Sequence, residues 1–408
     1  MKCGLLGRKL GHSYSPQIHR HLGDYPYILF EKEPEELEDF LRYGDFTGIN
    51  VTMPYKKDVI PYLDELSPVA KQLGAVNTIV RRSDGSLVGH NTDHFGFQTM
   101  LKNSGMQVSG KKCLVLGSGG ASNTAVHVLR DQGARVTVIS RSGDNHYNNL
   151  NLHQDAALIV NATPVGMYPH TEVRPLDLSL FPHLEGVLDV IYNPARTQLL
   201  LDAERRGLIA QNGLLMLVAQ AKEASEWFTG TEIPDSRIRK IHSLLRLQME
   251  NIILIGMPGC GKSTVGRLLA GKLGKEFADA DAYIEAAAGK SIPEIFAQDG
   301  ESRFRELETQ VLGEMGKRSG LVIATGGGCV TRAENYPLLH QNGSIIWLTR
   351  DIASLPTQGR PLSQANKLEY LYTLRKPLYD RFADCIVDNN SSLESVFDRI
   401  IGALEVMP

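Results

Sequence analysis

Residues 256–264 read Gly-Met-Pro-Gly-Cys-Gly-Lys-Ser-Thr and fit the phosphate-loop pattern G-x-x-x-x-G-K-[ST]. Backbone N–H groups of such a loop, at the positive end of the helix that follows, surround the phosphates of a nucleotide. The apolar residues 252–255 directly before it predict the strand that leads into the loop. We expect Lys262 to reach the outer phosphates and the Ser263 hydroxyl to bind Mg²⁺. The expected nucleotide-binding residues are Gly256, Gly259, Cys260, Gly261, Lys262, Ser263 and Thr264.

A second glycine-rich turn, Gly-Ser-Gly-Gly-Ala at residues 117–121, follows a predicted strand at residues 112–116, which is apolar after its first residue. It is an incomplete form of the dinucleotide pattern G-x-G-x-x-G, because the third glycine is absent. The next predicted strand, residues 135–139, is followed by Ser140 and Arg141 rather than by an acidic residue. An acid there would bind the ribose 2′-hydroxyl of NAD, whereas an arginine suits the 2′-phosphate of NADP. We therefore expect NADP; the alternative is that Arg141 is a solvated loop residue.

Polar side chains also stand at the ends of predicted strands in the first hundred residues. Taken singly, each has an ordinary explanation, since Asn and Asp near glycine usually cap helices or form turns and a single lysine is usually solvated. The set consists of Ser13, Ser15, Thr52, Lys56, Asn77 and Asp93.

Further charged and glycine residues follow the phosphate loop. Asp279 and Asp281 come at the end of a predicted strand, and the period of two in a strand would point both carboxylates the same way. Such a pair is more often part of a turn than of a site. The other residues of interest are Arg305, Gly327, Gly328, Arg360 and Arg375.

Composition narrows the class of protein. The chain has 408 residues, 42% of them hydrophobic and 22% charged, which is enough for two or three cores. A net charge of −3 without a long basic run argues against nucleic acid or an acidic membrane as the main partner. The five scattered cysteines suggest neither a disulfide framework nor a zinc site. We find no signal peptide or membrane span, and expect a cytoplasmic enzyme for small molecules whose oligomeric state the sequence does not give.

The motifs from residue 12 to residue 96 resemble, in order, the substrate-binding domain of shikimate dehydrogenases. This resemblance implies that Ser13, Ser15, Thr52, Asn77 and Asp93 hold the hydroxyls and carboxylate of a cyclohexene acid, and that Lys56 and Asp93 form the catalytic pair. The chemistry is reasonable, because a ketone that receives hydride develops alkoxide charge. An ammonium group can stabilise and protonate that oxygen, while a carboxylate orients the ammonium.

Three later segments, residues 161–167, 189–194 and 213–220, resemble the remaining motifs of the same family. The resemblance implies that Tyr192 and Gln220 approach the substrate. Residues 142–155 depart from the family, because they are too short for a full helix and strand, and we expect a sheet that is trimmed at its adenine side. The implied cofactor-binding residues are Gly117, Gly119, Gly120, Ala121, Ser140, Arg141, Asn161, Thr163, Met167 and Gly213.

Nearly all of residues 250–408 resembles shikimate kinase, a small phosphate-loop kinase with a mobile lid. The resemblance implies that Asp279 assists Mg²⁺ and that Asp281 orients or deprotonates the substrate hydroxyl. Arg305 and Arg375 would bind the shikimate carboxylate, and the backbone amides of Gly327 and Gly328 would contact the ring. Arg360, the single arginine of the expected lid at residues 352–364, would neutralise the transferred phosphoryl group.

These expectations define an α/β protein with three parts. Residues 1–103 and 221–248 would form the substrate-binding domain, residues 104–220 a Rossmann-like NADP domain, and residues 250–408 a kinase domain with a parallel sheet. The predicted enzyme reduces 3-dehydroshikimate with NADPH and then phosphorylates shikimate with MgATP.

Two alternatives remain at this stage. One is an NAD-dependent quinate/shikimate dehydrogenase joined to another small kinase, such as a gluconate kinase; Arg141, Arg305 and Arg375 argue against it. The other is a non-catalytic regulator that senses metabolites, which the presence of Lys56, Asp93, Lys262 and Asp281 opposes.

Overall fold

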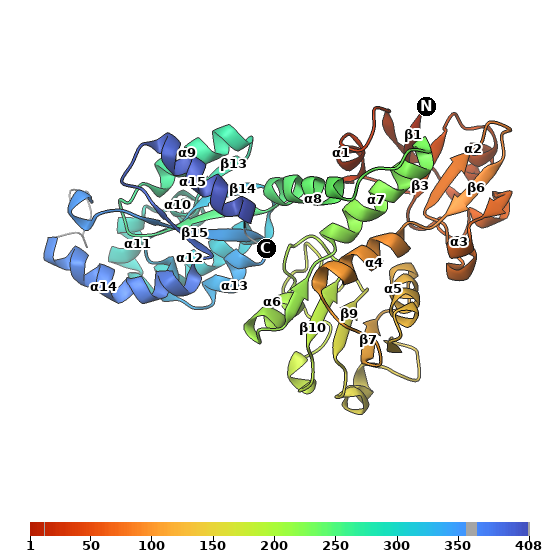
Figure 1. Ribbon diagram of the computed structural model, residues 1–408. Helices are drawn as coiled ribbons and strands as arrows, with labels where there is room; N and C mark the ends of the chain where they lie inside the picture. Colours follow the sequence, from red (N-terminus) through yellow and green to blue (C-terminus); the bar gives the residue numbers. More distant parts are fainter. Residues whose placement is uncertain (12, 356–364, 407–408) are drawn as a thin grey trace. The chain divides into compact units, whose positions relative to one another are not determined.

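The computed structural model describes residues 1–11, 13–355 and 365–406, and the chain divides into two compact units (Figure 1). The first unit contains Met1–Gly166, Val173–Tyr192 and Leu199–Leu244. The second contains Leu245–Pro408 and takes in two short segments, Met167–Glu172 and Asn193–Gln198. The three-part division expected from the sequence stays a prediction.

The first sheet of unit 1 has six strands in the order β2-β1-β3-β5-β6-β4. Strand β1 is parallel to β2 and β3, whereas β5 is antiparallel to β3 and β6. The carboxyl ends of β1, β3 and β6 and the amino end of β5 therefore lie at one edge of the sheet. The strands are β1 (Cys3–Gly7), β2 (Tyr27–Glu31), β3 (Gly48–Val51), β4 (Glu65–Leu66), β5 (Thr78–Arg81) and β6 (Leu87–His90), and the helices are α1 (Ser15–His19), η1 (Pro34–Glu36), α2 (Leu37–Tyr43), η2 (Ile60–Tyr62) and α3 (Pro68–Leu73).

The second sheet of unit 1 is parallel throughout, in the order β11-β10-β9-β7-β8. Strand β8 is an edge strand, and only the short 3₁₀ helix η3 lies between β8 and β9. The expected trimming after Arg141 is therefore confirmed. The strands are β7 (Lys112–Leu116), β8 (Arg135–Ile139), β9 (Leu158–Asn161), β10 (Gly186–Asp189) and β11 (Ile209–Gln211), and the helices are α5 (Gly120–Asp131), η3 (Tyr147–His153), η4 (Leu178–Leu180) and α6 (Gln198–Arg205).

Two long helices of unit 1, α4 (Asp93–Ser104) and α7 (Leu214–Thr229), pack side by side (Figure 1). A glycine permits their close approach, because a Cβ atom at Gly96 would lie 2.7 Å from the carbonyl oxygen of Met216. Buried Lys222 of α7 bonds Glu226 at 2.8 Å and Asp235 at 3.1 Å. The pair of helices matters for the site, since α4 begins with Asp93 and α7 carries Gln220.

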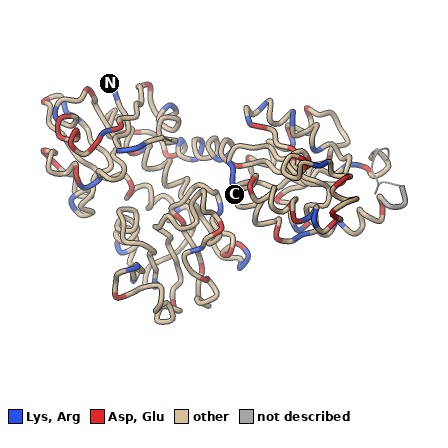
Figure 2. The backbone as a smooth tube through the Cα atoms, turned by 180° about the vertical axis from the view of Figure 1, so that it is seen from behind, with Lys and Arg blue, Asp and Glu red and all other residues tan. Residues whose placement is uncertain are grey.

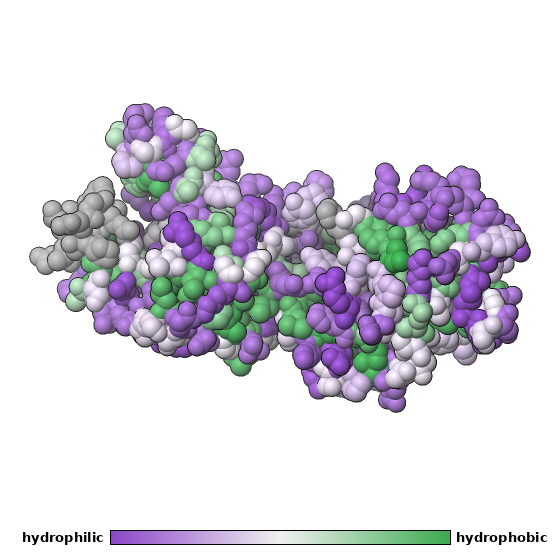
Figure 3. Space-filling view, turned by 90° about the horizontal axis from the view of Figure 1, so that it is seen from above, coloured by the Kyte–Doolittle hydropathy of each residue, from purple (hydrophilic) through white to green (hydrophobic). Residues whose placement is uncertain are grey.

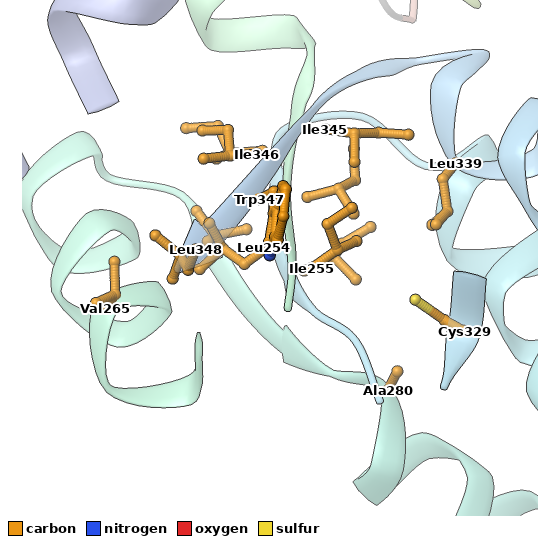
Figure 4. Packing of buried hydrophobic residues seen from close by; sticks show 14 of the residues in the cluster. Leu254, Ile255, Val265, Ala280, Cys329, Leu339, Ile345, Ile346, Trp347 and Leu348 are labelled. Carbon is orange, nitrogen blue, oxygen red and sulfur yellow. The ribbon is translucent and has the colours of Figure 1, made fainter. Parts of the chain in front are cut away.

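The sheet of unit 2 is also parallel, in the order β13-β14-β12-β15-β16. Central strand β12 is fully apolar in its last four residues, and these pack with Trp347 and other β15 side chains in the core (Figure 4). The strands are β12 (Asn251–Ile255), β13 (Glu276–Asp279), β14 (Leu321–Ala324), β15 (Gly343–Thr349) and β16 (Cys385–Asp388). The helices are α9 (Lys262–Leu273), α10 (Ala280–Ala288), α11 (Ile292–Gln298), α12 (Gly300–Lys317), η5 (Cys329–Thr331), α13 (Asn335–His340), η6 (Ile352–Ser354), α14 (Ala365–Phe382) and α15 (Leu393–Val406), and α8 (Ser236–Met249) joins the two units.

Charges of both signs are interspersed along both units (Figure 2). The face drawn in Figure 3 is largely hydrophilic, with apolar areas between polar ones. Across the described residues, every helix is too short or too polar to cross a lipid bilayer. All five cysteines are free thiols.

Acid should destabilise the first unit through His19, which is 1% exposed. Its Nδ1 atom lies 2.7 Å from the Tyr25 hydroxyl, and its ring stacks on Tyr27 at 4.0 Å. Burial lowers the pKa of His19 from 6.5 to about 3. The folded state disfavours the charged form of His19. The contribution of neutral His19 to the free energy of unfolding is therefore fully present above pH 6.5 and is lost as the pH falls toward 3. The expected loss is about 2 kcal/mol at pH 5.

Urea unfolding at pH 7.5, 6 and 5 tests this expectation. The chain has two tryptophans, so a Trp347→Phe background leaves Trp227 of the first unit as the fluorescent reporter. His19→Phe keeps a ring against Tyr27 and should remove most of the pH dependence, whereas substitution of exposed His21 should not. Equal pH slopes for the parent and His19→Phe would contradict the assignment.

Candidate active sites

Lys56 and Asp93 meet at the edge of the first sheet. The Lys56 Nζ atom lies 2.5 Å from Asp93 Oδ2, and their side chains are 25% and 9% exposed. Lys56 follows strand β3, and Asp93 is the first residue of helix α4, where the helix dipole favours an anion. The structure thus brings together two residues that are 37 positions apart, in a partly enclosed ion pair that retains an accessible ammonium group.

Asn77 connects this pair to helix α7. Its Oδ1 atom accepts a 2.7 Å hydrogen bond from the backbone N–H of Thr92, and its Nδ2 atom donates to Gln220 Oε1 at 3.2 Å. Asn91, just before Thr92, accepts from the backbone N–H of Asp93 at 3.1 Å. Asn77 is therefore hydrogen-bonded to Gln220 and to the backbone of the residue that precedes Asp93.

Ser13, Ser15 and Tyr192 form a second group in the same unit. The backbone N–H of Ser15 donates to Ser13 Oγ at 3.2 Å, and Tyr14 between them packs edge-on against Tyr192 at 6.1 Å. Burial raises the pKa of both tyrosines, so their hydroxyl groups are neutral donors at physiological pH. Thr52, at the end of β3, donates its backbone N–H to Leu6 at the end of β1 at 2.9 Å.

Two further residues join these groups and were missed from the sequence. The Tyr27 hydroxyl donates to Asn50 Oδ1 at 2.7 Å, and Asn50 Nδ2 donates to the carbonyl of Asn77 at 3.3 Å. Tyr27 also bonds the Ser15 side chain. Asn50 had a signal, since it is a polar residue inside the apolar run of β3, but Tyr27 had none.

The glycine turn after β7 is shaped for a phosphate-bearing ligand. Gly117 has a φ of 105°, and a Cβ atom there would lie 3.1 Å from the Ala162 carbonyl oxygen. Gly119 and Gly120, by contrast, have nothing within 4 Å of their would-be Cβ atoms. Helix α5 begins at Gly120, so Ala121 and its neighbours direct free backbone N–H groups into this open space. These features fit a dinucleotide.

The neighbouring strand ends support that turn. Asn161 donates to both carboxylate oxygens of Asp189 at 3.1 Å and accepts from the Thr163 hydroxyl at 2.7 Å. Gly213 immediately precedes α7, and a Cβ atom there would lie 2.0 Å from the Val190 carbonyl oxygen, so only glycine fits. Met167 is assigned to the second unit, and its expected place beside the nicotinamide stays a prediction.

The loop after β8 presents Arg141 to solvent. Ser140 donates its backbone N–H to the Asn145 carbonyl at 3.1 Å, which closes the loop. Arg141 is exposed and forms no ion pair with any residue that the structure describes. Its guanidinium group is therefore available to an anionic ligand.

The phosphate loop of unit 2 has the expected geometry. Gly256, Gly259 and Gly261 have φ values of 143°, 82° and 101°, which favour glycine. Lys262 donates to the carbonyls of Gly256 at 2.9 Å and Met257 at 3.0 Å. Helix α9 begins at Lys262, so the N–H groups at its start face the phosphate position.

Asn389, which sequence reasoning missed, fixes this loop from the end of strand β16. Its Nδ2 atom donates to the Cys260 carbonyl at 2.6 Å and would lie 2.5 Å from a Cβ atom at Gly261. The Asp-Asn-Asn sequence around it gave no signal, because such residues are common in turns.

Ser263 and Asp279 fit the expected magnesium site. The Ser263 hydroxyl donates to Asp279 Oδ2 at 2.8 Å, and Mg²⁺ in nucleotide sites takes few protein oxygens besides phosphate and water. Among the described residues there is no cluster of three or more His, Cys, Asp or Glu side chains that could hold a metal alone.

The prediction that Asp279 and Asp281 project the same way from one strand was wrong. Asp279 ends β13 and caps helix α10, accepting the backbone N–H of Asp281 at 3.2 Å. The period of two therefore does not apply beyond Asp279. Asp281 nevertheless reaches the site, because its Oδ1 atom would lie 3.0 Å from a Cβ atom at Gly326.

Arg305 and Arg375 converge on the glycines after β14. Arg375 Nη1 donates to the Gly327 carbonyl at 3.1 Å, and a Cβ atom at Gly328 would lie 2.3 Å from the Arg305 guanidinium. Arg305 also bonds Glu308 at 2.7 Å; this carboxylate is 0% exposed. Burial raises the pKa of Glu308 and Arg305 opposes that rise. Glu308 was missed, although its spacing of three from Arg305 on a helix was a signal.

The residues expected to bind shikimate thus lie around the glycines that follow β14, with cations from α12 and α14 and a carboxylate from α10. Arg360 lies outside the described residues, and its role stays a prediction.

Comparison with known proteins gives two family matches. Residues 5–79 match the model of the shikimate dehydrogenase substrate binding domain, and residues 258–405 match the model of shikimate kinase. The chain is 38% identical over 264 residues to the NADP-dependent shikimate dehydrogenase of Symbiobacterium thermophilum, which covers 57% of this chain and 90% of that relative.

Solved structures agree with this match. Shikimate dehydrogenase 1 from Peptoclostridium difficile has a TM-score of 0.56 and 37% identity, covering 60% of this chain and 98% of that one. Shikimate 5-dehydrogenase from Thermus thermophilus, in complex with NADP(H) and shikimate, has a TM-score of 0.54 and 32% identity, covering 59% and 98%.

The folds and sites define a dinucleotide-dependent oxidoreductase joined to a phosphate-loop kinase. The chain belongs to the shikimate dehydrogenase family, and its C-terminal part is a shikimate kinase domain.

Proposed function

We propose that this chain catalyses two reactions in turn: reduction of 3-dehydroshikimate to shikimate with NADPH, and phosphorylation of shikimate with MgATP. The observation that carries the proposal is the presence of both constellations in one chain. One unit contains the Lys56–Asp93 pair, with Asn77 bonded to Gln220 and to the backbone N–H of Thr92 beside Asp93, and the other contains the phosphate loop with Arg305 and Arg375.

In the first reaction, the reduced dinucleotide supplies hydride to the C3 ketone. Lys56 is the group that stabilises the developing alkoxide and gives it a proton, because its ammonium is accessible and Asp93 orients it at 2.5 Å. Asn77 and Gln220 are polar groups of fixed direction that can bind the ring hydroxyls. We assign Ser13, Ser15, Thr52 and Tyr192 to the remaining hydroxyl and carboxylate contacts.

In the second reaction, Asp281 orients the C3 hydroxyl or takes its proton. Arg305 and Arg375 hold the carboxylate of the ring, and Lys262 neutralises charge on the outer phosphates. Ser263 and Asp279 are the residues that would hold Mg²⁺. In this scheme the oxygen that receives a proton in the first reaction becomes the nucleophile of the second.

Neither alternative is favoured. A gluconate kinase would not need Arg305 and Arg375 to bind the carboxylate of a ring beside the carboxylate of Asp281. A regulator without catalytic activity would not need the Lys56–Asp93 ion pair. We propose a cytoplasmic location, consistent with small-molecule substrates and the interspersed charges of Figure 2.

Separate half-reactions test the proposal. With shikimate and NADP⁺ but no ATP, the purified chain should reduce NADP⁺. With shikimate and MgATP but no dinucleotide, it should release ADP. Quinate and gluconate serve as rival substrates. A chain that prefers quinate with NAD⁺, or gluconate with ATP, would support the rival enzyme, and a chain without turnover would support the regulator.

Arg141→Ala should weaken the use of NADPH far more than that of NADH, because only NADPH carries the 2′-phosphate. Loss of one charge-assisted contact of about 1.5–3 kcal/mol corresponds to a KM for NADPH raised roughly 10- to 150-fold. Steady-state kinetics with both cofactors give the answer, with exposed Arg130→Ala of helix α5 as the matched control. Equal changes for the two cofactors would show that Arg141 does not contact the phosphate.

A further inference from the structure

The carbonyl oxygen of Gly327 is a point at which three parts of the kinase site meet. It accepts a 3.1 Å hydrogen bond from Arg375 Nη1 and a 2.5 Å hydrogen bond from the Tyr379 hydroxyl. The same glycine lies against the phosphate loop, since a Cβ atom at position 327 would lie 2.6 Å from Pro258 Cδ. Tyr379 therefore contacts the same backbone group as an expected shikimate-binding arginine.

The ring of Tyr379 is held firmly by the core. The residue is 0% exposed, and its ring stacks on Trp347 with centroids 5.4 Å apart. Trp347 belongs to β15 and lies opposite Ile255 of the central strand β12, among the core residues of Figure 4. Burial raises the pKa of Tyr379, so its hydroxyl remains a donor at any working pH. A rigid ring with a protonated hydroxyl is suited to fixing a backbone carbonyl.

The nucleotide side of the site has supports of its own. Lys262 bonds two carbonyls of the phosphate loop, and Asn389 bonds the Cys260 carbonyl at 2.6 Å. The Tyr379 hydroxyl meets this loop only through Met257 Sδ at 3.9 Å, which is a weak contact. Loss of the hydroxyl should therefore disturb the Gly327 side of the site and leave the phosphate loop in place.

We propose that Tyr379 is a positioning residue for the phosphoryl acceptor. Its hydroxyl fixes the position of the Gly327 carbonyl. The backbone that contacts the shikimate ring is held in place with it, and so is the Arg375 guanidinium, which donates to the same carbonyl. The inference rests on the proposed kinase function. It adds that Tyr379 supports the binding of shikimate and not the binding of ATP.

Tyr379→Phe tests the proposal, because phenylalanine keeps the stacked ring and removes only the hydroxyl. We expect the KM for shikimate to rise about fivefold to tenfold, as for one lost hydrogen bond to a buried acceptor, while the KM for ATP stays within about twofold. ADP release without a dinucleotide is the assay. Tyr283→Phe is the matched control, since its exposed hydroxyl bonds Arg318 at 3.2 Å on the surface of the same unit.

A second variant guards against a general loss of packing. Gly327→Ala changes the residue that carries this carbonyl, since its Cβ atom would lie 2.6 Å from Pro258 Cδ, and it should also raise the KM for shikimate. If both changes act through this carbonyl, the double variant should be less impaired than the product of the two single effects. An unchanged KM for shikimate in Tyr379→Phe, an equal rise for ATP, or fully multiplicative effects would overturn the proposal. A parent chain without shikimate-dependent ADP release would instead refute the proposed function.

Discussion

Lys56→Ala should lower the kcat for reduction of 3-dehydroshikimate by about 10²- to 10⁴-fold, the range for loss of a positioned proton donor. The Lys56 ammonium is the accessible partner of the 2.5 Å ion pair with Asp93, so its removal leaves the developing alkoxide without a cation. Asp93 would then stand as a nearly buried carboxylate without its partner, which adds repulsion toward the same oxygen. Oxidation of NADPH at saturating substrate measures the effect.

The chain supplies two controls for this variant. Lys57→Ala removes the adjacent, exposed lysine and should leave reduction near the parent value. Shikimate-dependent ADP release by Lys56→Ala should also be near the parent value, because Lys56 and the phosphate loop lie in different compact units. Loss of both activities in a folded variant would refute the separation of the two reactions.

Lys262→Met should abolish the kinase reaction, with a fall in kcat of about 10³-fold or more, because the phosphates lose their fixed cation in the loop. Lys262 is 8% exposed and is held within the loop by the carbonyls of Gly256 and Met257. Methionine preserves most of the length of the side chain and its packing. The measurement is ADP release at saturating shikimate.

Lys272→Met is the matched control, because this residue lies on the same helix, α9, and forms its ion pair with Glu394 at the surface. It should retain kinase activity. Reduction of 3-dehydroshikimate should be unchanged in both variants. Substantial phosphorylation by Lys262→Met would show that other groups carry the phosphate charge and that the assigned role of this lysine is mistaken.

Local patterns were sufficient for the elements that lead directly into a site. The phosphate loop, the glycine turn after β7 and the missing helix and strand after Arg141 follow from consecutive residues, because backbone geometry there depends on neighbours in the chain. Strand β7 has the predicted bounds, and helix α5 begins at Gly120, because the glycine turn passes directly into the helix. The Asp281 error has a related cause, since α10 begins immediately after Asp279.

The supporting residues could not be predicted in the same way. Tyr27, Tyr379 and Asn389 act through tertiary contacts, whereas Glu308 pairs with Arg305 on the same helix, and each has an ordinary explanation as a core or turn residue in its own segment. Glu308 and Tyr379 each lie within about one helical turn of an arginine that the resemblance identified, which is the one local clue to them. The reacting groups are therefore easier to find from sequence than the residues that hold them in position.

The central claim is that one chain carries out both reactions on the same oxygen. The most direct measurement is a single incubation with 3-dehydroshikimate, NADPH deuterated at the transferable hydrogen, and MgATP. We predict consumption of NADPH and ATP in equal amounts, and shikimate 3-phosphate that carries deuterium on C3. Accumulation of deuterated shikimate without a phosphate ester, or ADP release from 3-dehydroshikimate and MgATP when NADPH is left out, would contradict the account.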